Sequence, residues 1–549
     1  MKVFRKAIPT GKWSLRGLFM ACGFVLFFLL FILFDALFPF RADKIQYSQV
    51  IYAADSSLLH AFLSADHKWR LYARHDEITP DLRKSIIFKE DRYFKYHPGF
   101  NPLAMVRAAF YNLATGRRTS GASTITMQLA RLIKPAPRTY KNKLREVFRA
   151  MQLEWHYSKS EILQMYLNLL PFGGNIEGVK SASMIYFGQE TGELSLAQVV
   201  MLTVIPNNPN ALRPGKSYDK LKARRNFWLS KMAEEGLFEK ADTDDAIAEP
   251  FDRQRFAIPA NAPHLSYRLK NVVSGKNGVM TTIQPELQNK VENLVSNHVR
   301  LLRSMQITNA AVLVVNNHTL EVEAYVGSAG FYDDLYQGQV DGISALRSPG
   351  STLKPLLYAL AFDRGLITPR TVVTDVPSNF NGYRPENYDE TYRGKITIEQ
   401  ALALSLNVPA VNLLDRMGNE PFLDALSKSD FKWITRNRQK LGLSVILGGC
   451  GTTLQELTAL FASFANKGVY HPLKFIKSEI ASFSDTLCSQ DAAYMLSQIL
   501  TGLKRPDLPQ QYRQSADLPL IAWKTGTSYG RRDGWAIGYN RDYTVGVWT

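Results

Sequence analysis

Ser351 and Lys354 stand three residues apart in the stretch STLK, which opens the apolar run LKPLLYALAF. In a helix this spacing puts both side chains on one face, where the lysine amine can accept the proton of the serine hydroxyl. The Ser-x-x-Lys pattern alone is weak evidence, because the chain repeats it at Ser217 and Ser429. Only Ser351 follows a Pro-Gly turn and begins an apolar helix. We therefore predict a nucleophilic serine at this position, with Lys354 as its base.

Two further motifs downstream of this pair make the pattern specific. They are Ser405-Leu406-Asn407, at a predicted helix–loop boundary, and Lys524-Thr525-Gly526-Thr527, on a predicted strand. The glycine of the second motif has no Cβ atom, so a substrate backbone can approach the strand closely. The three motifs together indicate catalysis by a serine nucleophile.

A second group of polar residues belongs to helices nearer the N-terminus. Glu90, in the stretch EDRYFKYHPG, ends a helix that is predicted to begin at Thr79-Pro80. The helix dipole disfavours a carboxylate there and tends to raise its pKa, which suits a general base. An ordinary surface glutamate is the alternative.

Downstream, GASTITMQLAR places Thr124, Gln128 and Arg131 on one face of a helix, and Lys143 and Glu146 fall one turn apart. A polar stripe of this kind is more often solvated than catalytic.

These residues must be positioned by helices and strands, and the hydrophobic periodicity of the sequence indicates a helical part and a β-rich part. The pattern is helical over about 76–235, polar and mixed over 236–305, and β-rich from 310, where AAVLVVNNHTLEVEAYVGS predicts a hairpin. The end, LIAWKTGTSYGRRDGWAIGYNRDYTVGVWT, predicts two or three antiparallel strands. Helices are predicted at 285–303, 351–365, 396–416, 453–468 and 489–503.

Residues 18–34 are apolar or small and uncharged, giving about 26 Å of helix, close to the hydrocarbon thickness of a bilayer. A cleaved secretory signal is the alternative, but no small-x-small cleavage site follows. We predict an uncleaved anchor over 18–38. Residues 1–17 carry five Lys or Arg and no acid, which places them in the cytoplasm and the rest of the chain outside.

The charge and composition exclude several classes. The formal net charge of the 549 residues is +17, and residues 81–160 hold 16 Lys or Arg against five Asp or Glu. Such a run is usually a solvated surface, but a phosphorylated substrate at the membrane would explain its position. Nucleic acid fits poorly, because the run lies beyond the predicted anchor. Three cysteines without CxxC or HExxH exclude a disulfide scaffold and give no sign of structural zinc.

Five stretches of the helical part resemble, in order, the motifs of the family 51 peptidoglycan glycosyltransferases. They cover about residues 76–230 and are EDRYFKYHPG, GASTITMQLAR, NKLRE, KSEILQMYLN and GGNIEGVKSASMIYFG. The resemblance implies a lysozyme-like, all-α domain that polymerises lipid II into β-1,4 glycan. The family usually has Arg-Lys where this chain has Asn142-Lys143, and Lys141 or Arg145 are the candidates to supply the missing charge.

The same resemblance implies roles for single residues. Glu90 would be the base that deprotonates the 4-hydroxyl of the acceptor sugar, and Glu146 would be the second carboxylate, near the anomeric carbon and pyrophosphate of the donor. Lys143 and Arg131 would neutralise the leaving undecaprenyl pyrophosphate. The positions that shape the cleft would be Asp91, Phe94, His97, Thr124 and Gln128. No cofactor is implied as a requirement, and a divalent cation for this reaction stays open.

The three motifs around Ser351 resemble the transpeptidase domain of penicillin-binding proteins over about residues 306–549. This implies an α/β fold, an antiparallel sheet flanked by helices. Ser351 would attack the D-Ala-D-Ala carbonyl of a stem peptide with Lys354 as base. Ser405 would relay protons, Asn407 would hold the stem peptide, and its carboxylate would be bound by Lys524 and Thr527, with Thr525 and Gly526 beside them. The backbone N–H groups of Ser351 and Thr527 would form the oxyanion hole. Serine β-lactamases share these motifs, but the anchor and the upstream glycosyltransferase motifs favour a penicillin-binding protein.

The sequence is thus identified as a member of the class A, bifunctional penicillin-binding proteins. The rival hypothesis is a membrane-anchored scaffold that binds lipid II or stem peptides with only the glycosyltransferase active. A scaffold has no need to keep a nucleophile and a base together, so the presence of both in this sequence disfavours the scaffold hypothesis. The expected ranges are a cytoplasmic tail (1–17), the anchor (18–38), a membrane-proximal linker (41–75), the glycosyltransferase (76–235), a connector (236–305) and the transpeptidase (306–549).

The resemblance also implies partners and a location. The partners would be lipid II, the growing glycan strand, stem peptides, β-lactams, membrane lipids and proteins of cell-wall synthesis, without nucleic acid. The location would be a bacterial inner (plasma) membrane, with the catalytic domains in the periplasm or outside the cell. In the family a C-terminal helix packs on the sheet after the strand that ends at YTVGVWT. We therefore expect the chain to be a fragment whose transpeptidase part is unstable.

One helical face is a candidate membrane contact. Leu103, Val106, Phe110 and Leu113 share a face within FNPLAMVRAAFYNLATG, interrupted by Arg107. Ordinary core packing is an equally good interpretation of this pattern. In the family the region between the first two motifs dips towards the bilayer, which a lipid-linked substrate would require.

Overall fold

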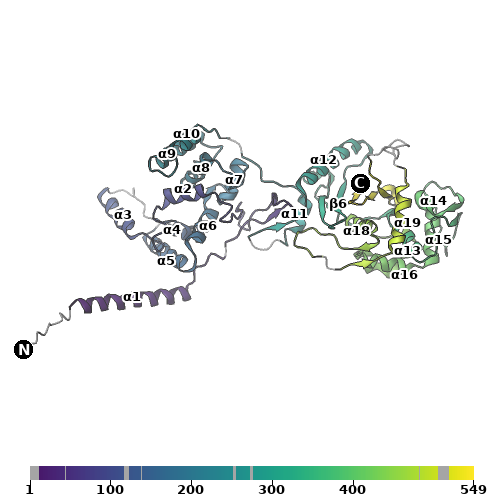
Figure 1. Ribbon diagram of the computed structural model, residues 1–549, viewed down its shortest axis with the longest axis horizontal. Helices are drawn as coiled ribbons and strands as arrows, with labels where there is room; N and C mark the ends of the chain where they lie inside the picture. Colours follow the sequence, from purple (N-terminus) through teal and green to yellow (C-terminus); the bar gives the residue numbers. More distant parts are fainter. Residues whose placement is uncertain are drawn as a thin grey trace, which may run out of the picture. The chain divides into compact units, whose positions relative to one another are not determined.

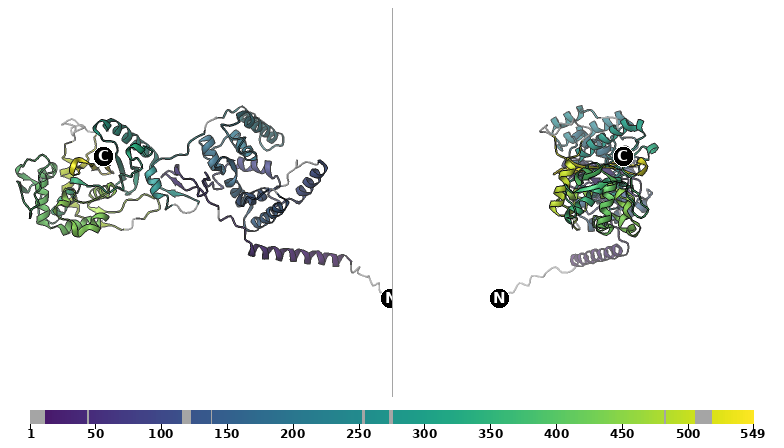
Figure 2. Two further views of the ribbon diagram at one scale, coloured as in Figure 1. Left: turned by 180° about the vertical axis from the view of Figure 1, so that it is seen from behind. Right: turned by 90° about the vertical axis from the view of Figure 1, so that its right-hand side faces the viewer.

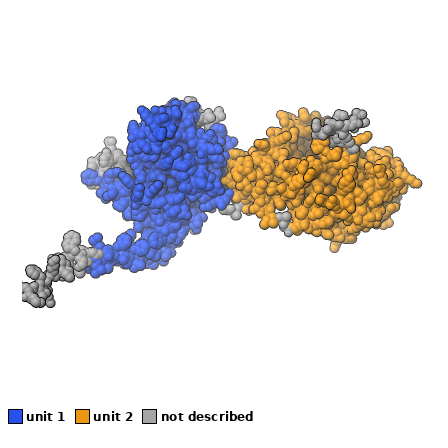
Figure 3. All heavy atoms as spheres, viewed as in Figure 1, with its two compact units in different colours: residues 1–49, 62–258, 275–277 blue, residues 50–61, 259–274, 278–549 orange. Residues whose placement is uncertain are grey.

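The computed structural model describes residues 12–43, 45–115, 123–137, 139–251, 255–272, 276–480, 483–504 and 518–549. The chain divides into two compact units: unit 1 comprises 1–49, 62–258 and 275–277, and unit 2 comprises 50–61, 259–274 and 278–549 (Figure 3). The predicted linker at 41–75 and the predicted connector at 236–305 are therefore each shared between the two units, and neither is a unit of its own.

Unit 1 is built almost entirely of helices, as the periodicity predicts. The helices are α1 (Lys12–Leu37), α2 (Pro80–Glu90), α3 (Pro102–Thr115), α4 (Ile125–Ile133), α5 (Tyr140–His156), α6 (Lys159–Leu169), α7 (Val179–Phe187), α8 (Leu196–Val204), α9 (Tyr218–Glu234) and α10 (Lys240–Ala248). A short 3₁₀ turn, η1 (Ile205–Asn207), follows α8, and two short strands, β3 (Pro171–Gly173) and β4 (Ile176–Glu177), form a hairpin. The core lies around α8, which is apolar on nearly all sides and buried.

Helix α1 extends away from the cluster formed by the other helices of unit 1 (Figures 1 and 2). Its stretch Leu18–Leu37 is long and apolar enough to cross a membrane, in agreement with the predicted anchor. Its C-terminal end packs on α5, where the ring of Phe31 lies edge-on to that of Phe148. There His156 and Gln152 donate hydrogen bonds of 2.8 and 2.9 Å to the carboxylate of Asp35.

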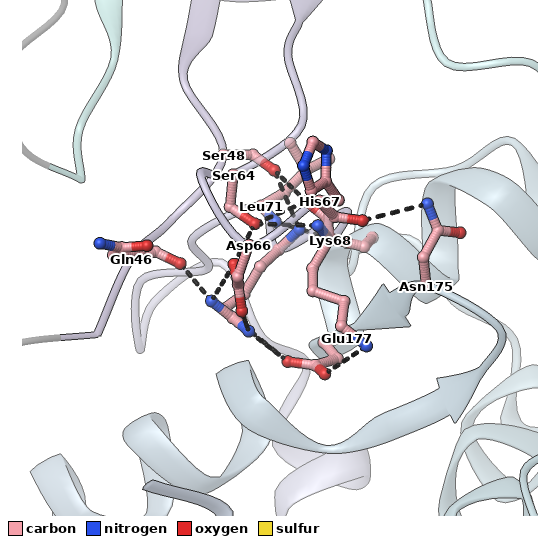
Figure 4. A network of polar contacts seen from close by, with 11 residues as sticks. Gln46, Ser48, Ser64, Asp66, His67, Lys68, Leu71, Asn175 and Glu177 are labelled. Atoms are coloured by element: carbon pink, nitrogen blue, oxygen red, sulfur yellow. Dashed lines mark hydrogen bonds and ion pairs between the residues drawn. The ribbon is translucent and has the colours of Figure 1, made fainter.

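A polar network ties an irregular segment before α2 to the β3–β4 hairpin (Figure 4). The buried guanidinium of Arg70 pairs with Asp66 at 2.8 Å and with Glu177 at 2.6 Å. Lys68 adds an ion pair of 3.3 Å to Glu177. A buried cation is tolerated only when it is paired and hydrogen-bonded, and here it is both. Residues 62–75 of the predicted membrane-proximal linker are thus packed within unit 1.

Unit 2 is built around a five-stranded antiparallel sheet. Its strand order is β12 (Ala522–Thr527), β13 (Gly534–Tyr539), β14 (Tyr543–Trp548), β6 (Ala311–Asn316), β7 (Val322–Val326). The strands alternate their side chains between two faces. Val312 and Val314 pack against α12 (Pro285–Leu302), while α18 (Leu454–Ala465) covers the other face, with its Thr458 against Gly546 of β14. An antiparallel sheet flanked by helices is confirmed.

The remaining elements of unit 2 surround this sheet. The helices are α11 (Pro263–Leu269), η2 (Arg303–Met305), η3 (Asp334–Tyr336), η4 (Gly350–Leu353), α13 (Lys354–Asp363), α14 (Ile398–Ala403), α15 (Asn407–Met417), α16 (Asn419–Lys428), α17 (Lys432–Asn437), η5 (Arg438–Lys440), η6 (Leu443–Leu447), α19 (Gln490–Thr501) and η8 (Tyr529–Arg531). The short strands are β1 (Val50–Tyr52), β2 (Leu58–Ala61), β5 (Val279–Met280), β8 (Val372–Asp375), β9 (Gly394–Thr397), β10 (Val469–Tyr470) and β11 (Asp485–Thr486). The helical stretch predicted over 396–416 is two helices, α14 and α15, and the break between them lies at the helix–loop boundary predicted at Ser405.

Candidate active sites

Glu90 is the last residue of α2, where the sequence predicts it. Gln128 of α4 donates a hydrogen bond of 3.1 Å to Glu90 Oε2, and the hydroxyl of Tyr166 on α6 donates one of 3.0 Å to Gln128 Oε1. The ammonium of Lys89 also contacts the Glu90 carboxylate. Glu90 is thus a partly buried carboxylate whose two oxygens contact Lys89 and Gln128, and its role as a base stays a prediction.

Glu146 of α5 is the second carboxylate and lies between two cations. Its Oε1 is 3.3 Å from Nε of Arg131, and its Oε2 is 3.2 Å from Nζ of Lys143. Arg131 and Gln128 are one turn apart on α4, so this helix contacts both carboxylates through one face. The polar stripe of α4 is therefore part of a cluster with Glu90 and Glu146 and is not simply a solvated surface.

Four of the predicted cleft positions lie between the end of α2 and the start of α4. Asp91 accepts hydrogen bonds from the backbone of Ile125, at 3.0 Å, and from Nε2 of His97. Thr124 caps α4 and donates a hydrogen bond of 2.6 Å to the carbonyl oxygen of Gly99. Phe94 is buried, with its ring edge-on to that of His97. The hydrogen bonds of Asp91 and Thr124 tie the end of α2 and the segment after it to the start of α4.

The position of the family's missing arginine is occupied by Asn142 at the start of α5. Its Nδ2 donates to the carbonyl oxygen of Pro137 at 2.9 Å, and its Oδ1 accepts a hydrogen bond of 3.2 Å from Arg145. The guanidinium of Arg145 therefore lies beside residue 142. Of the two candidates for the missing charge, Arg145 has a contact that fits this role.

Lys354 is the first residue of α13 and is fully buried. Its Nζ donates hydrogen bonds of 2.6 Å to the carbonyl oxygen of Ser405 and 2.7 Å to Oδ1 of Asn407. Burial, and then the nearby charge of Lys524, hold the pKa of this amine well below its usual range. A lowered pKa favours the neutral amine that a base needs, and the role of Lys354 as the base for Ser351 stays a prediction.

The turn that carries Ser351 touches the edge strand β12. Gly350 has φ +54°, and a Cβ atom on it would lie 2.4 Å from the carbonyl oxygen of Thr527. A Cβ atom on Gly526 would lie 2.5 Å from the carbonyl oxygen of Pro349. Gly526 is therefore needed for the approach of this chain's own backbone, whereas the sequence predicted room for a substrate. The residue before Ser351 therefore lies against Thr527, and the oxyanion hole of the Ser351 and Thr527 N–H groups stays a prediction.

Lys524 and its neighbours alternate along β12. Lys524 and Gly526 are buried, while Thr525 and Thr527 are exposed. Nζ of Lys524 donates a hydrogen bond of 2.7 Å to the carbonyl oxygen of Thr525. Burial lowers the pKa of Lys524 to about 7. Because β12 is an edge strand, its free side can pair with an extended peptide.

Ser405 and Asn407 lie at the junction of α14 and α15. The backbone of Ser405 is left-handed, with φ +56°, a conformation that costs a non-glycine residue about 1–2 kcal/mol. Its carbonyl oxygen faces Lys354, and Asn407 uses its Oδ1 for the same amine. The predicted proton relay through the hydroxyl of Ser405 and the predicted hold of Asn407 on a stem peptide stay predictions.

The sequence reasoning missed two residues that contact these sites. Tyr166 donates a hydrogen bond to Gln128 and so orients it. Its position inside the motif KSEILQMYLN was the feature of the sequence that could have identified it. Asn387, in the loop between β8 and β9, accepts a hydrogen bond of 2.8 Å from the backbone of Asn407. No local pattern identifies Asn387, because its partner lies 20 residues further along the chain.

Comparisons with known proteins agree with both sites. A family model described as Transglycosylase matches residues 55–233, and one described as Penicillin binding protein transpeptidase domain matches residues 310–547. The Haemophilus influenzae penicillin-binding protein 1A structure superposes with a TM-score of 0.53 at 18% identity, covering 92% of this chain and 88% of that one. This likeness concerns the fold.

Two curated relatives extend the comparison along the chain. Penicillin-binding protein 1C of Escherichia coli (strain K12) is 37% identical over 521 residues, which cover 94% of this chain and 66% of the relative. Penicillin-binding protein 1B of Vibrio cholerae is 29% identical over 513 residues, which cover 87% of this chain and 65% of the relative. The chain thus spans slightly less than two thirds of the length of these two. It carries a transglycosylase and a transpeptidase domain and belongs to the class A penicillin-binding proteins.

Proposed function

We propose that the protein polymerises lipid II into glycan strands in unit 1 and crosslinks their stem peptides in unit 2. The observation that supports this proposal is that each unit brings together several of the groups that its reaction would need. In unit 1 these are the carboxylates of Glu90 and Glu146 with the cations of Arg131 and Lys143. In unit 2 they are the Ser351 turn, the buried amine of Lys354 and the strand that carries Lys524.

In the polymerisation step, Glu90 takes the proton of the 4-hydroxyl of the acceptor sugar. The oxygen then bonds to the anomeric carbon of the donor, and the bond from that carbon to the pyrophosphate breaks with its electron pair on the leaving group. Arg131 and Lys143, now paired with Glu146, would bind the pyrophosphate oxygens as charge develops on them. Arg131 and Lys143 would supply positive charge for this step, so we propose that no cofactor is required, while a divalent cation on the pyrophosphate would add to their charge.

In the crosslinking step, the neutral amine of Lys354 takes the proton of Ser351 Oγ, and the oxygen attacks the carbonyl carbon of the penultimate D-Ala. The terminal D-Ala leaves with that proton. An amine of a second stem peptide then attacks the ester carbonyl, the bond to Ser351 Oγ breaks, and the proton of the amine passes through Lys354 to Oγ. Lys524 in its charged form would bind the terminal carboxylate, and the free edge of β12 would pair with the stem backbone. β-Lactams would acylate Ser351 by the same attack and remain bound.

We also propose a location for these reactions. The apolar helix α1 supports a membrane anchor, and the five cations of residues 1–17 favour a cytoplasmic N-terminus. Both units would then lie on the outer side of the inner membrane, where the lipid-linked substrate is held.

The experiment uses the full chain in detergent with labelled lipid II, with and without penicillin, and resolves glycan length and crosslinks. Because α12 and α18 pack on the two faces of the sheet, we expect unit 2 to be folded, contrary to the instability expected from the sequence. We therefore expect crosslinked glycan without the drug and uncrosslinked glycan with it. Ser351→Ala should make uncrosslinked glycan in both conditions and lose covalent labelling by fluorescent penicillin. Glycan without crosslinks in the wild-type protein would favour a scaffold with only the glycosyltransferase active, and labelling that persists in Ser351→Ala would exclude Ser351 as the nucleophile.

A further inference from the structure

Asn387 is a buried amide in the loop that leaves β8 and returns to β9. Its Nδ2 donates hydrogen bonds of 2.9 and 3.0 Å to the two carboxylate oxygens of Asp375 and one of 2.9 Å to the carbonyl oxygen of Thr391. Asp375, the last residue of β8, is fully buried and also accepts a hydrogen bond of 2.8 Å from the backbone of Arg393. The loop is thereby closed on itself, and the orientation of the Asn387 amide is fixed.

The other end of this amide contacts the start of α15. Oδ1 of Asn387 accepts hydrogen bonds from the backbone N–H groups of Asn407, at 2.8 Å, and Val408, at 3.4 Å. The first N–H groups of a helix have no partner within the helix, and α15 receives no side-chain cap from Leu406 before it. Asn387 therefore caps α15 from a distant part of the chain.

The same loop also fixes the side chain of Asn407. Nδ2 of Asn407 donates a hydrogen bond of 2.7 Å to the carbonyl oxygen of Glu386. Because the amide nitrogen is used there, Oδ1 is the atom that faces Lys354, at 2.7 Å from Nζ. Residues 386 and 387 thus determine both where Asn407 lies and which of its atoms meets the amine.

We infer that Asn387, held by Asp375, is a positioning residue for the acylation of Ser351, acting through Asn407 on Lys354. Asn387 does not touch the reacting atoms. It keeps Oδ1 of Asn407, which accepts a hydrogen bond from the Lys354 amine, in place. It thereby fixes the direction from which that amine approaches the serine hydroxyl. This inference rests on the proposed transpeptidase function and adds to it a pair of residues from outside the three motifs.

The test separates the limiting rate of acylation from affinity and from folding. Full-chain protein in detergent is titrated with fluorescent penicillin for stoichiometry, and the rate is followed to saturation. We expect Asn387→Ala to be acylated stoichiometrically, with a limiting rate about 10- to 100-fold lower than that of the wild type, as for misplaced reacting groups. The matched control is Asn379→Ala, in the same loop, whose exposed side chain accepts a hydrogen bond from the backbone of Gly382. It should keep the wild-type rate.

An exchange of the two side chains tests the pairing itself. Asn387→Asp puts two carboxylates together. Asp375→Asn replaces one acceptor oxygen by an N–H donor that faces other donors. Acylation should therefore be slow in each single variant. The double variant D375N/N387D restores a donor opposite an acceptor and keeps an acceptor for the N–H groups of α15. We expect its limiting rate to exceed those of both single variants by about tenfold, as coupled neighbours do.

Each outcome decides the inference. A wild-type limiting rate in Asn387→Ala overturns the inference. A double variant that is as slow as the single variants, or that lacks a cooperative unfolding transition, also overturns it. The reason is that the exchange conserves the pairing of residues 375 and 387 on which the inference depends. If Asn387→Ala does not fold, the test rests on the double variant, and recovery of its limiting acylation rate supports the inference. Absence of acylation in the wild-type protein would instead contradict the proposed function.

Discussion

At the scale of single residues, Glu90 carries the most direct prediction. Glu90→Gln keeps the shape of the side chain but removes the proton acceptor, so glycan polymerisation should fall by about 10²- to 10⁴-fold, the usual contribution of a general base. Covalent labelling by penicillin should be unchanged, because Ser351 belongs to the other unit. The measurement is the glycan yield from labelled lipid II. The matched control is Glu234→Gln, since Glu234 is the exposed last residue of α9. Polymerisation near the wild-type rate in Glu90→Gln would exclude Glu90 as the base.

Lys524 should make acylation sensitive to pH. Burial lowers the pKa of its ammonium to about 7, and only the charged form can bind a carboxylate, so binding should weaken as the pH rises through that value. The second-order rate of acylation reports the free enzyme, and we expect it to fall by up to about tenfold per pH unit on the alkaline side. In Lys524→Arg the guanidinium stays charged. The alkaline decline should disappear there, even though the rate is lower, and its persistence would assign it to another group.

At the scale of elements, α3 distinguishes two interpretations of one sequence pattern. Leu103, Val106 and Phe110 are 84, 69 and 77% exposed, so core packing is wrong for these three residues, while the side chain of Leu113 lies outside the described residues. Membrane contact stays a prediction for this face. Exposed apolar side chains that gather on one helix face are typical of an interaction surface.

Phe110→Asp should therefore weaken the binding of a chain without residues 1–40 to liposomes of anionic lipid. The aspartate would place a charge at the bilayer surface, where burying a phenylalanine contributes about 2 kcal/mol, so the partition coefficient should fall at least tenfold. Flotation of the protein with the liposomes measures it. Phe227→Asp is the matched control, since Phe227 is a similarly exposed phenylalanine on α9. Equal flotation of the two variants would show that α3 does not enter the bilayer.

The elements also show which parts of the sites the sequence could predict. Glu90 at the end of α2 and Lys354 one turn after Ser351 follow from local spacing, which helix geometry converts directly into position. The helix–loop boundary predicted at Ser405 is confirmed by the break between α14 and α15, although the helical pattern predicted over 396–416 runs through it. The left-handed backbone of Ser405 and its contact with Lys354 could not be predicted, because both depend on tertiary packing. The capping of α15 by Asn387 was equally inaccessible, since it joins segments that no local pattern connects.

At the scale of the whole molecule, the chain holds two compact units, each with its own set of candidate residues. Multi-domain chains commonly unfold in more than one transition. We expect two transitions for the full chain in detergent. Covalent acylation of Ser351 should stabilise only unit 2, whose transition should rise by about 2 °C or more, since a domain of this size shifts by roughly 2–4 °C per kcal/mol. The loss of penicillin labelling on heating identifies which transition belongs to unit 2.

Ser351→Ala serves as the control for this thermal measurement. The variant keeps both units but cannot form the ester, so penicillin should leave both of its transitions where they are. A single transition that moves as a whole on acylation of the wild-type protein would mean that the two units unfold together. It would contradict the independence on which the prediction for Glu90→Gln also depends, because a change in one unit would then alter the stability of the other.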